Sequence, residues 1–241
     1  YLGSVDVAYA IARSVNTVAV KVGQLVTPQS IYDFLYNDLE IHSLTETDID
    51  IAPMALGSTT YGVTPLELAG AFQMFANGGY YITPHAYTHV LDSDGKIVLE
   101  ANATPRRVLS EDTAVLMNKL LQGVVTGDGG TAHAAQIPGM PTAGKTGTSD
   151  KNLDQWFVGF SPYYVCEVWL GYDRPNTYDQ YGNTIPNSIL YNQFPTPYLF
   201  RDLMTPIHEG LEPKAFMESD NLTQEAYCTV TGNLLGPDCP S

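Results

Sequence analysis

The stretch Lys145-Thr146-Gly147-Thr148 places a cation, two hydroxyls and a glycine side by side. It is predicted to end a short strand, and a glycine inside a strand indicates that another backbone or a ligand comes close. Lys145 would supply a positive charge, and Thr146 and Thr148 hydroxyls, on a strand whose edge can bind an extended peptide. These groups suit a peptide that ends in a carboxylate. An ordinary edge strand is the alternative, because Lys-Thr-Gly is a short pattern that recurs by chance.

A second polar pair, Ser14 and Asn16, lies near the beginning of the chain. It separates two predicted helices, one from Ser4 to Ile11 with Ser4 as its N-cap and one from Thr17 to Leu25. Serine and asparagine side chains can take the hydrogen bonds of the backbone, so the pair can be a simple helix break. The other interpretation is a functional pair.

The strand that carries Lys145 needs neighbouring strands to hold it. Apolar residues alternate along Asp154–Phe160, after a turn-prone segment at 149–153, so the two strands are predicted to form a hairpin. A third strand is predicted at Tyr164–Tyr172. Another hairpin is predicted from Tyr87–Leu91 and Ile97–Leu99, with its turn at 94–95.

Helices are predicted before and after these strands in the sequence. The clearest begins at Thr64, with Pro65 at the first helical position and Glu67 completing a capping box, and it is expected to end before 77–79. The other predicted helices run over 29–37, from the N-cap Ser110 to 121, and over 197–209. A long loop is expected at 174–197. Helices and an antiparallel sheet in this order predict an α+β fold.

The composition excludes several functions. The chain has 241 residues and a net charge of −15, with a pI of about 4.4, so no basic surface is expected for nucleic acid or for an anionic membrane. The histidines have no metal spacing, since His85 and His89 lie in a strand-like segment that contains Pro84. The glycines at 127–130 are not followed by the lysine and hydroxyl of a phosphate loop. No metal and no cofactor are predicted.

Three cysteines are present. Cys166 lies in an apolar run and is interpreted as a small buried residue. Cys228 and Cys239 flank a turn near the C-terminus, so a disulfide between them is possible if the chain lies outside the cytoplasm. No run of eighteen apolar residues and no signal peptide is found in the sequence.

Together, Ser14-Val15-Asn16 and Lys145-Thr146-Gly147-Thr148 resemble two of the three active-site motifs of penicillin-binding proteins. Three further stretches resemble the transpeptidase domain of the bifunctional, class A members: 62–69, 75–79 and 154–160. The resemblance runs from Tyr1 to about Glu209. It implies the transpeptidase fold shared with serine β-lactamases, an antiparallel sheet flanked by helices plus a mostly helical subdomain. Residues 1–210 would form the C-terminal portion of this domain, and 211–241 a tail or small appendage.

The resemblance implies acyl transfer on peptidoglycan stem peptides that end in D-Ala-D-Ala, with β-lactams as mimics of that end. Ser14 would relay a proton to the leaving nitrogen, and Asn16 would orient the substrate amide. Lys145 would supply the positive charge of the site and support its proton network. Thr146, Gly147 and Thr148 would bind the substrate, the threonines through its carboxylate, and the Thr148 N–H would donate to the oxyanion.

One motif of the family has no counterpart in the expected place. The nucleophile belongs to a Ser-x-x-Lys motif that precedes Ser-x-Asn by several dozen residues, and here the literal match is 93–96, in a predicted hairpin turn. We therefore expect Ser93 to be non-catalytic and the chain to work with a missing segment, carried by a companion chain of the same polypeptide. The resemblance also implies an extracytoplasmic location in the cell envelope, with the parent protein anchored to the cytoplasmic membrane by an N-terminal helix.

Two other functions stay open from the sequence. A DD-carboxypeptidase or a serine β-lactamase shares the Lys-Thr-Gly strand and passes the acyl group to water. A non-catalytic β-lactam sensor or scaffold would have lost its nucleophile.

Overall fold

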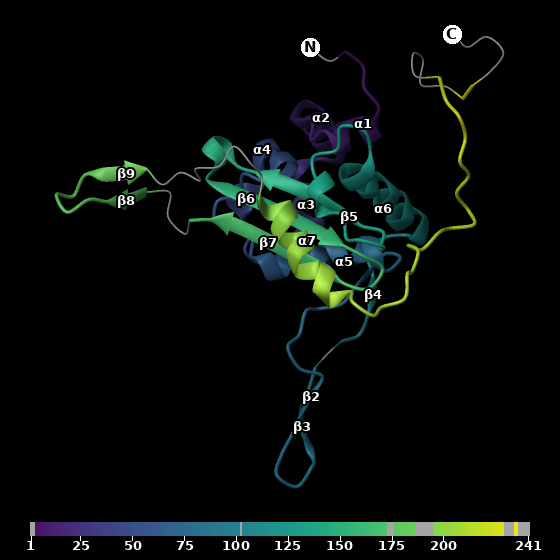
Figure 1. Ribbon diagram of the computed structural model, residues 1–241. Coiled ribbons are helices and arrows are strands. Elements are labelled where there is room, and N and C mark those ends of the chain that lie inside the picture. The colour runs from purple at the N-terminus through teal and green to yellow at the C-terminus, as the bar shows by residue number, and fades with distance from the viewer. Residues whose placement is uncertain (1–2, 102, 173–175, 187–194, 229–233, 236–241) are drawn as a thin grey trace.

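A three-stranded antiparallel sheet forms the centre of the molecule, with helices on both of its faces (Figure 1). The computed structural model describes residues 3–101, 103–172, 176–186, 195–228 and 234–235. The strand order is β5 (Ala143–Thr148), β6 (Asp154–Phe160) and β7 (Val165–Gly171). β5 therefore lies at an edge of the described sheet, as the sequence predicted.

The described residues also form seven α-helices and six shorter strands, besides short 3-10 and π-helical turns. The helices are α1 (Val7–Ala12), α2 (Asn16–Val26), α3 (Pro28–Asp33), α4 (Ile51–Leu56), α5 (Pro65–Ala76), α6 (Glu111–Thr126) and α7 (Pro195–Ile207). The strands are β1 (Tyr80–Tyr81), β2 (His89–Leu91), β3 (Ile97–Glu100), β4 (Arg106–Arg107), β8 (Asn176–Tyr178) and β9 (Thr184–Pro186). Each of these strands pairs antiparallel: β1 with β4, β2 with β3, and β8 with β9.

The main core surrounds the sheet. α7 covers one face, where the fully buried ring of Phe200 lies 4.9 Å, centroid to centroid, from that of Phe157 on β6. α5 lies across the other face, and α6 packs alongside β5 and buries Val124 and Val125 (Figure 1). Burying these apolar side chains contributes roughly 1.5–3 kcal/mol each, so the helices fix the position of the edge strand.

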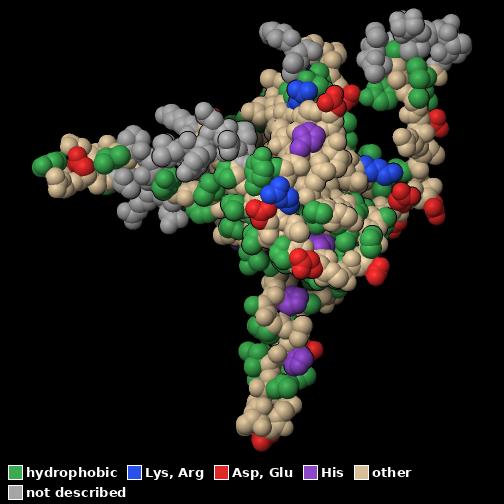
Figure 2. Space-filling model, in the orientation of Figure 1, with side chains coloured by type: hydrophobic (Ala, Val, Ile, Leu, Met, Phe, Trp, Pro, Cys, Tyr) green, Lys and Arg blue, Asp and Glu red, His purple; other side chains and the backbone are tan. Residues whose placement is uncertain are grey.

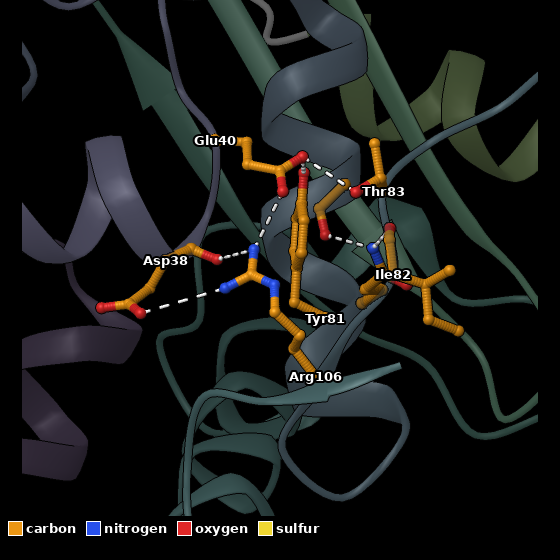
Figure 3. Close-up of polar contacts among 8 residues, drawn as sticks. Asp38, Glu40, Tyr81, Ile82, Thr83 and Arg106 are labelled. Atoms are coloured by element: carbon orange, nitrogen blue, oxygen red, sulfur yellow. Dashed lines mark hydrogen bonds and ion pairs between the residues drawn. The ribbon is translucent and has the colours of Figure 1, made fainter. Parts of the chain in front are cut away.

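A second, smaller core joins α5 to the segment that runs from α3 to α4. It holds Leu39, Ile41, Leu44, Met54, Ala71, Met74 and Tyr81. A polar cluster closes one side of it (Figure 3): the Arg106 guanidinium donates to the Asp38 carbonyl at 2.9 Å and to the Glu40 carboxylate at 3.0 Å. The hydroxyl of Thr83 donates to the same carboxylate at 2.9 Å. The cluster therefore ties β4 and the segment after β1 to the segment between α3 and α4.

Several helices begin or end away from their predicted residues. Asp6, and not Ser4, caps α1, because its carboxylate accepts the Tyr9 N–H at 2.6 Å. The helix predicted at 29–37 divides into α3 and a π-helical turn over Phe34–Asp38. α5 follows the prediction at both ends, and its capping box between Thr64 and Glu67 is formed.

The C-terminal segment after α7 returns to the body. Phe216 is buried, and its ring lies 5.6 Å from that of Phe160. The Tyr227 hydroxyl donates to the Asp6 carboxylate at 2.9 Å, which brings the tail beside the start of α1. The division of the chain at residue 210 stays a prediction. The possible disulfide between Cys228 and Cys239 involves a cysteine, Cys239, that lies outside the described residues.

The β2–β3 hairpin projects from the body (Figure 1). Every residue of its two strands is exposed, and apolar side chains lie along it (Figure 2). Ser93 lies in the exposed turn at its tip. The Ser-x-x-Lys sequence at 93–96 is therefore separated from the sheet that carries Lys145.

Candidate active site

The edge strand β5 presents Lys145 and the two threonines. Lys145 pairs with Val158 of β6, and Thr146 with Phe157, so Lys145 and Thr146 point to opposite faces of the sheet. A Cβ at Gly147 would lie 3.2 Å from the Cβ of Trp156, a tight contact with the neighbouring strand. The close approach predicted at Gly147 is thus made by a side chain of β6.

Ser14 lies at the turn between α1 and α2. Its φ is +55°, in the left-handed region that few residues other than glycine adopt. The turn is closed by a 2.9 Å hydrogen bond from the Val15 N–H to the Ala10 carbonyl. Asn16 begins α2, and its side chain is exposed. The helix break predicted from these residues is therefore present, and it turns the Ser14 side chain toward the sheet.

Lys145 and Ser14 are brought together by the fold. Lys145 Nζ donates to Ser14 Oγ at 2.9 Å, between residues 131 positions apart in the chain, and also to the Thr146 carbonyl at 2.9 Å. Burial lowers the pKa of Lys145 to about 8, because a charged amine is poorly solvated there. An amine with this pKa can both hold and release a proton near neutral pH.

A buried carboxyl group shares the face of the sheet with Lys145. Glu167 on β7 lies opposite Val158, which in turn lies opposite Lys145. Among the described residues neither oxygen of the Glu167 carboxyl has a hydrogen-bond partner. Burial raises its pKa to about 8, so the group is protonated and neutral at pH 7. It therefore adds no negative charge beside the lysine under these conditions.

The turn that follows β5 is fixed by polar contacts. Ser149 Oγ donates to the Asp154 carboxylate at 3.0 Å and accepts the Asp154 N–H at 2.8 Å. The indole N–H of Trp169 donates to the same carboxylate at 3.1 Å. Thr148, directly before this turn, is exposed. The end of the strand is thus held in place while its threonine stays open to solvent.

Two residues near the site were not predicted as part of it. Thr131 Oγ1 lies 2.8 Å from Thr146 Oγ1. The Arg13 guanidinium packs so closely on Gly129 that a Cβ there would overlap it. No local pattern marks either residue, because each contact joins segments that are distant in the sequence.

Comparison with known proteins identifies the family. Residues 1–194 match the penicillin binding protein transpeptidase domain. The chain belongs to this family. The family resemblance drawn from the sequence is confirmed, including its class A character, because penicillin-binding proteins 1A are among the relatives.

Relatives with the family's name match most of the chain. Penicillin-binding protein 1A of Clostridium botulinum (strain Langeland) is 31% identical over 238 residues, which cover 97% of this chain and 27% of that protein. Penicillin-binding protein 1A of Aquifex aeolicus is 37% identical over 174 residues, 71% of this chain and 22% of the relative. This chain thus spans about a quarter of the length of these relatives. The matching residues belong to one longer chain in each, so the predicted companion chain finds no support.

Solved structures of the family share the fold. The penicillin-binding protein 1A of Haemophilus influenzae superposes with a TM-score of 0.74, at 19% identity, over 97% of this chain and 38% of that one. PonA1 of Mycobacterium tuberculosis, in complex with penicillin V, gives a TM-score of 0.72 at 20% identity, over 92% and 61%. The predicted α+β transpeptidase fold is confirmed.

The described residues hold neither a metal-ligand cluster nor a membrane-spanning helix. No group of three or more His, Cys, Asp or Glu side chains there is placed to hold a metal ion. No helix within the same residues is long and apolar enough to cross a membrane.

Proposed function

We propose that this chain is the part of a peptidoglycan DD-transpeptidase that carries the Ser-x-Asn and Lys-Thr-Gly-Thr motifs, and that β-lactams bind the same site. The observation that carries the proposal is the 2.9 Å hydrogen bond from Lys145 Nζ to Ser14 Oγ. It joins the two motifs at the open edge of the sheet, where an extended stem peptide could lie against β5.

The reaction is acyl transfer through a serine ester. A serine hydroxyl attacks the carbonyl between two D-alanines, the terminal D-alanine leaves, and the amine of a neighbouring stem takes the acyl group. The attacking serine and its lysine come from a Ser-x-x-Lys segment outside these residues, since Ser93 lies in the β2–β3 turn. That segment would belong to the same polypeptide, which we propose to be anchored to the cytoplasmic membrane with this domain outside it.

Ser14 and Lys145 would move the proton to the leaving group. The leaving nitrogen must gain a proton as its bond to the carbonyl carbon breaks. Ser14 can donate its hydroxyl proton to this nitrogen, and Lys145 can stabilise the resulting alkoxide or return a proton to it. A lysine with a pKa near 8 suits this role better than one that is always charged. Asn16, exposed at the start of α2, would hold the substrate amide.

The threonines and Gly147 would bind the substrate's C-terminal end. Thr146 and Thr148 share one face of β5 and supply two hydroxyls for the terminal carboxylate. The Thr148 N–H would donate to the oxyanion, an interaction worth roughly 3–4 kcal/mol of barrier. Gly147 between them would offer only main-chain groups to the peptide, because the space beside its Cα is taken by the Trp156 side chain.

Labelling with a fluorescent penicillin tests the proposal. The polypeptide that joins a Ser-x-x-Lys segment to this chain is expected to take up label, and this chain alone is not. Label on this chain alone would show that the nucleophile lies within it. A parent polypeptide that takes no label would favour a sensor or scaffold without catalysis. Product analysis with an amine acceptor then separates a transpeptidase from a carboxypeptidase or β-lactamase, which use water.

A further inference from the structure

The loop before β5 reaches the threonine that follows Lys145. Thr131 is exposed, and its Oγ1 lies 2.8 Å from Oγ1 of the half-buried Thr146. Either oxygen can be the donor in this pair. Lys145 Nζ donates to the main-chain carbonyl of Thr146, so its contact with this residue does not involve the Thr146 hydroxyl.

The direction of this hydrogen bond decides what Thr146 can offer a ligand. A threonine hydroxyl has one hydrogen to donate and two lone pairs that accept. If Thr146 donates to Thr131, no hydrogen is left for a carboxylate. If Thr131 donates, the hydrogen of Thr146 can point to the carboxylate, and a bond to a charged acceptor is about twice as strong as a neutral one. Successive hydrogen bonds from Thr131 to Thr146 and from Thr146 to the anion also polarise and strengthen each other.

The loop that carries Thr131 is fixed on two sides. The Ala132 N–H donates to the Val124 carbonyl of α6 at 3.0 Å, and the Gly130 N–H donates to the Gly127 carbonyl at 3.0 Å. Gly129, at a φ of +73°, packs against the guanidinium of Arg13, the residue directly before Ser14. Arg13 in turn lies over the ring of Tyr9, 5.3 Å from its centroid. One loop thus spans the distance between the Ser14 turn and the edge strand.

We propose that Thr131 is a positioning residue of the carboxylate subsite, whose hydroxyl donates to Thr146 Oγ1 and so directs the Thr146 hydrogen to the carboxylate of the bound ligand. The inference rests on the proposed function, because it assumes that Thr146 meets a carboxylate. It adds a residue outside the three motifs to the site.

The test compares a ligand with and without the carboxylate. The second-order rate of acylation is measured for benzylpenicillin and for its methyl ester, on the parent polypeptide with its Ser-x-x-Lys segment. Thr131→Val, which keeps the shape and removes the hydroxyl, is expected to slow acylation by benzylpenicillin about five- to tenfold. The ester is expected to change little. Thr131→Ser keeps the donor and is expected to restore the rate.

A matched control and a double substitution complete the design. Thr126→Val removes another exposed hydroxyl from the same region, one that bonds to the Gln122 carbonyl of its own helix, and is expected to leave both rates unchanged. Thr131→Val and Thr146→Val together are expected to cost about as much as Thr146→Val alone. Equal slowing of both ligands by Thr131→Val, no slowing, or full additivity of the two substitutions would overturn the inference. A wild-type protein that penicillin does not acylate would instead contradict the proposed function.

Discussion

Lys145 Nζ and Ser14 Oγ lie 2.9 Å apart although the two residues are 131 positions apart in the chain. The edge strand places the lysine, and a left-handed turn between two helices places the serine. Neither element alone forms the pair. The contact therefore reports on the packing of the N-terminal helices against the sheet.

The first prediction concerns this pair. In the parent polypeptide, Ser14→Ala and Lys145→Ala are each expected to lower the rate of acylation by penicillin by about 10²- to 10⁴-fold, because both act on proton transfer. The double substitution is expected to cost little more than the worse single one, since the residues act as a unit. Stopped-flow acylation rates measure this. Lys119→Ala, at an exposed lysine of α6, serves as the control. Additive losses would mean that the two side chains work independently.

Gly129 is expected to tolerate no side chain. Gly129→Ala would force a methyl group into the Arg13 guanidinium and displace the residue that precedes Ser14. Gly139→Ala is a matched control, because Gly139 has the same φ of +73° and no atom lies within 4 Å of the position its Cβ would take. Both substitutions carry the backbone strain of a left-handed alanine, about 1 kcal/mol of stability. Only Gly129→Ala is expected to slow acylation as well. Equal rates in the two variants would show that Arg13 does not transmit the change.

Glu167 is expected to make stability depend on pH. Its pKa is raised to about 8, so the folded chain keeps a proton that the unfolded chain releases above its ordinary value of 4.5. The free energy of unfolding therefore falls as pH rises between these values, by at most about 1.4 kcal/mol per pH unit from this group. Glu167→Gln removes this dependence.

Urea denaturation at about pH 5 and pH 8 measures the difference. The stability of Glu167→Gln relative to wild type is expected to increase over this range and to level off above it. Lys145 makes the free energy of unfolding rise with pH, mostly above pH 8, because its pKa is lowered from 10.5 to about 8. This effect is the same in both proteins and does not change their difference. Glu225→Gln, at an exposed position, is the control. A constant difference between the two proteins would mean that the carboxyl finds a partner in solution.

Ser161, directly after β6, and His208, directly after α7, form a buried polar contact. Ser161 Oγ accepts the N–H groups of Tyr163 and Tyr164, and it lies 2.7 Å from His208 Nε2. His208 Nδ1 lies 2.7 Å from the Met204 carbonyl, so this nitrogen carries the hydrogen and Nε2 accepts from the serine.

Ser161→Ala would leave these groups without their partner. The expected loss is about 2–3 kcal/mol in the free energy of unfolding. Ser58→Ala, at an exposed serine, is expected to change it by less than about 0.5 kcal/mol. Urea denaturation followed by tryptophan fluorescence measures both. A loss for Ser161→Ala as small as that of the control would mean that water replaces the hydroxyl without cost.

Local signals in the sequence predicted several elements well. The capping box of Thr64 and Glu67 depends on neighbouring residues alone, and α5 has the predicted bounds. The alternating apolar residues predict β6 and an apolar run predicts β7, whereas β5 shows no such alternation and ends in small and hydroxyl residues. α6 continues past its predicted end to Thr126, because the helix includes Gly123 and ends only at Gly127. A glycine weakens a helix but does not terminate it when the surrounding face is buried.

Contacts between distant segments could not be read in the same way. The loop predicted at 174–197 contains the paired strands β8 and β9, since a sequence rich in Asn, Pro and Tyr shows no clear alternation. The two motifs of the site were found through the family resemblance, and their pairing needed the fold. Thr131 and Arg13 carry no motif, so their places beside Thr146 and Gly129 became visible only in three dimensions.

The left-handed backbone of Ser14 lowers the stability of the fold but places a hydroxyl beside Lys145. A serine held at a φ of +55° costs the native state about 1 kcal/mol relative to glycine. Ser14→Gly is therefore expected to unfold at a higher urea concentration than wild type while losing the hydroxyl that meets Lys145. The domain would then be less stable than it could be, because the strained turn is needed to place the Ser14 hydroxyl. Selection for stability alone would favour glycine at this position.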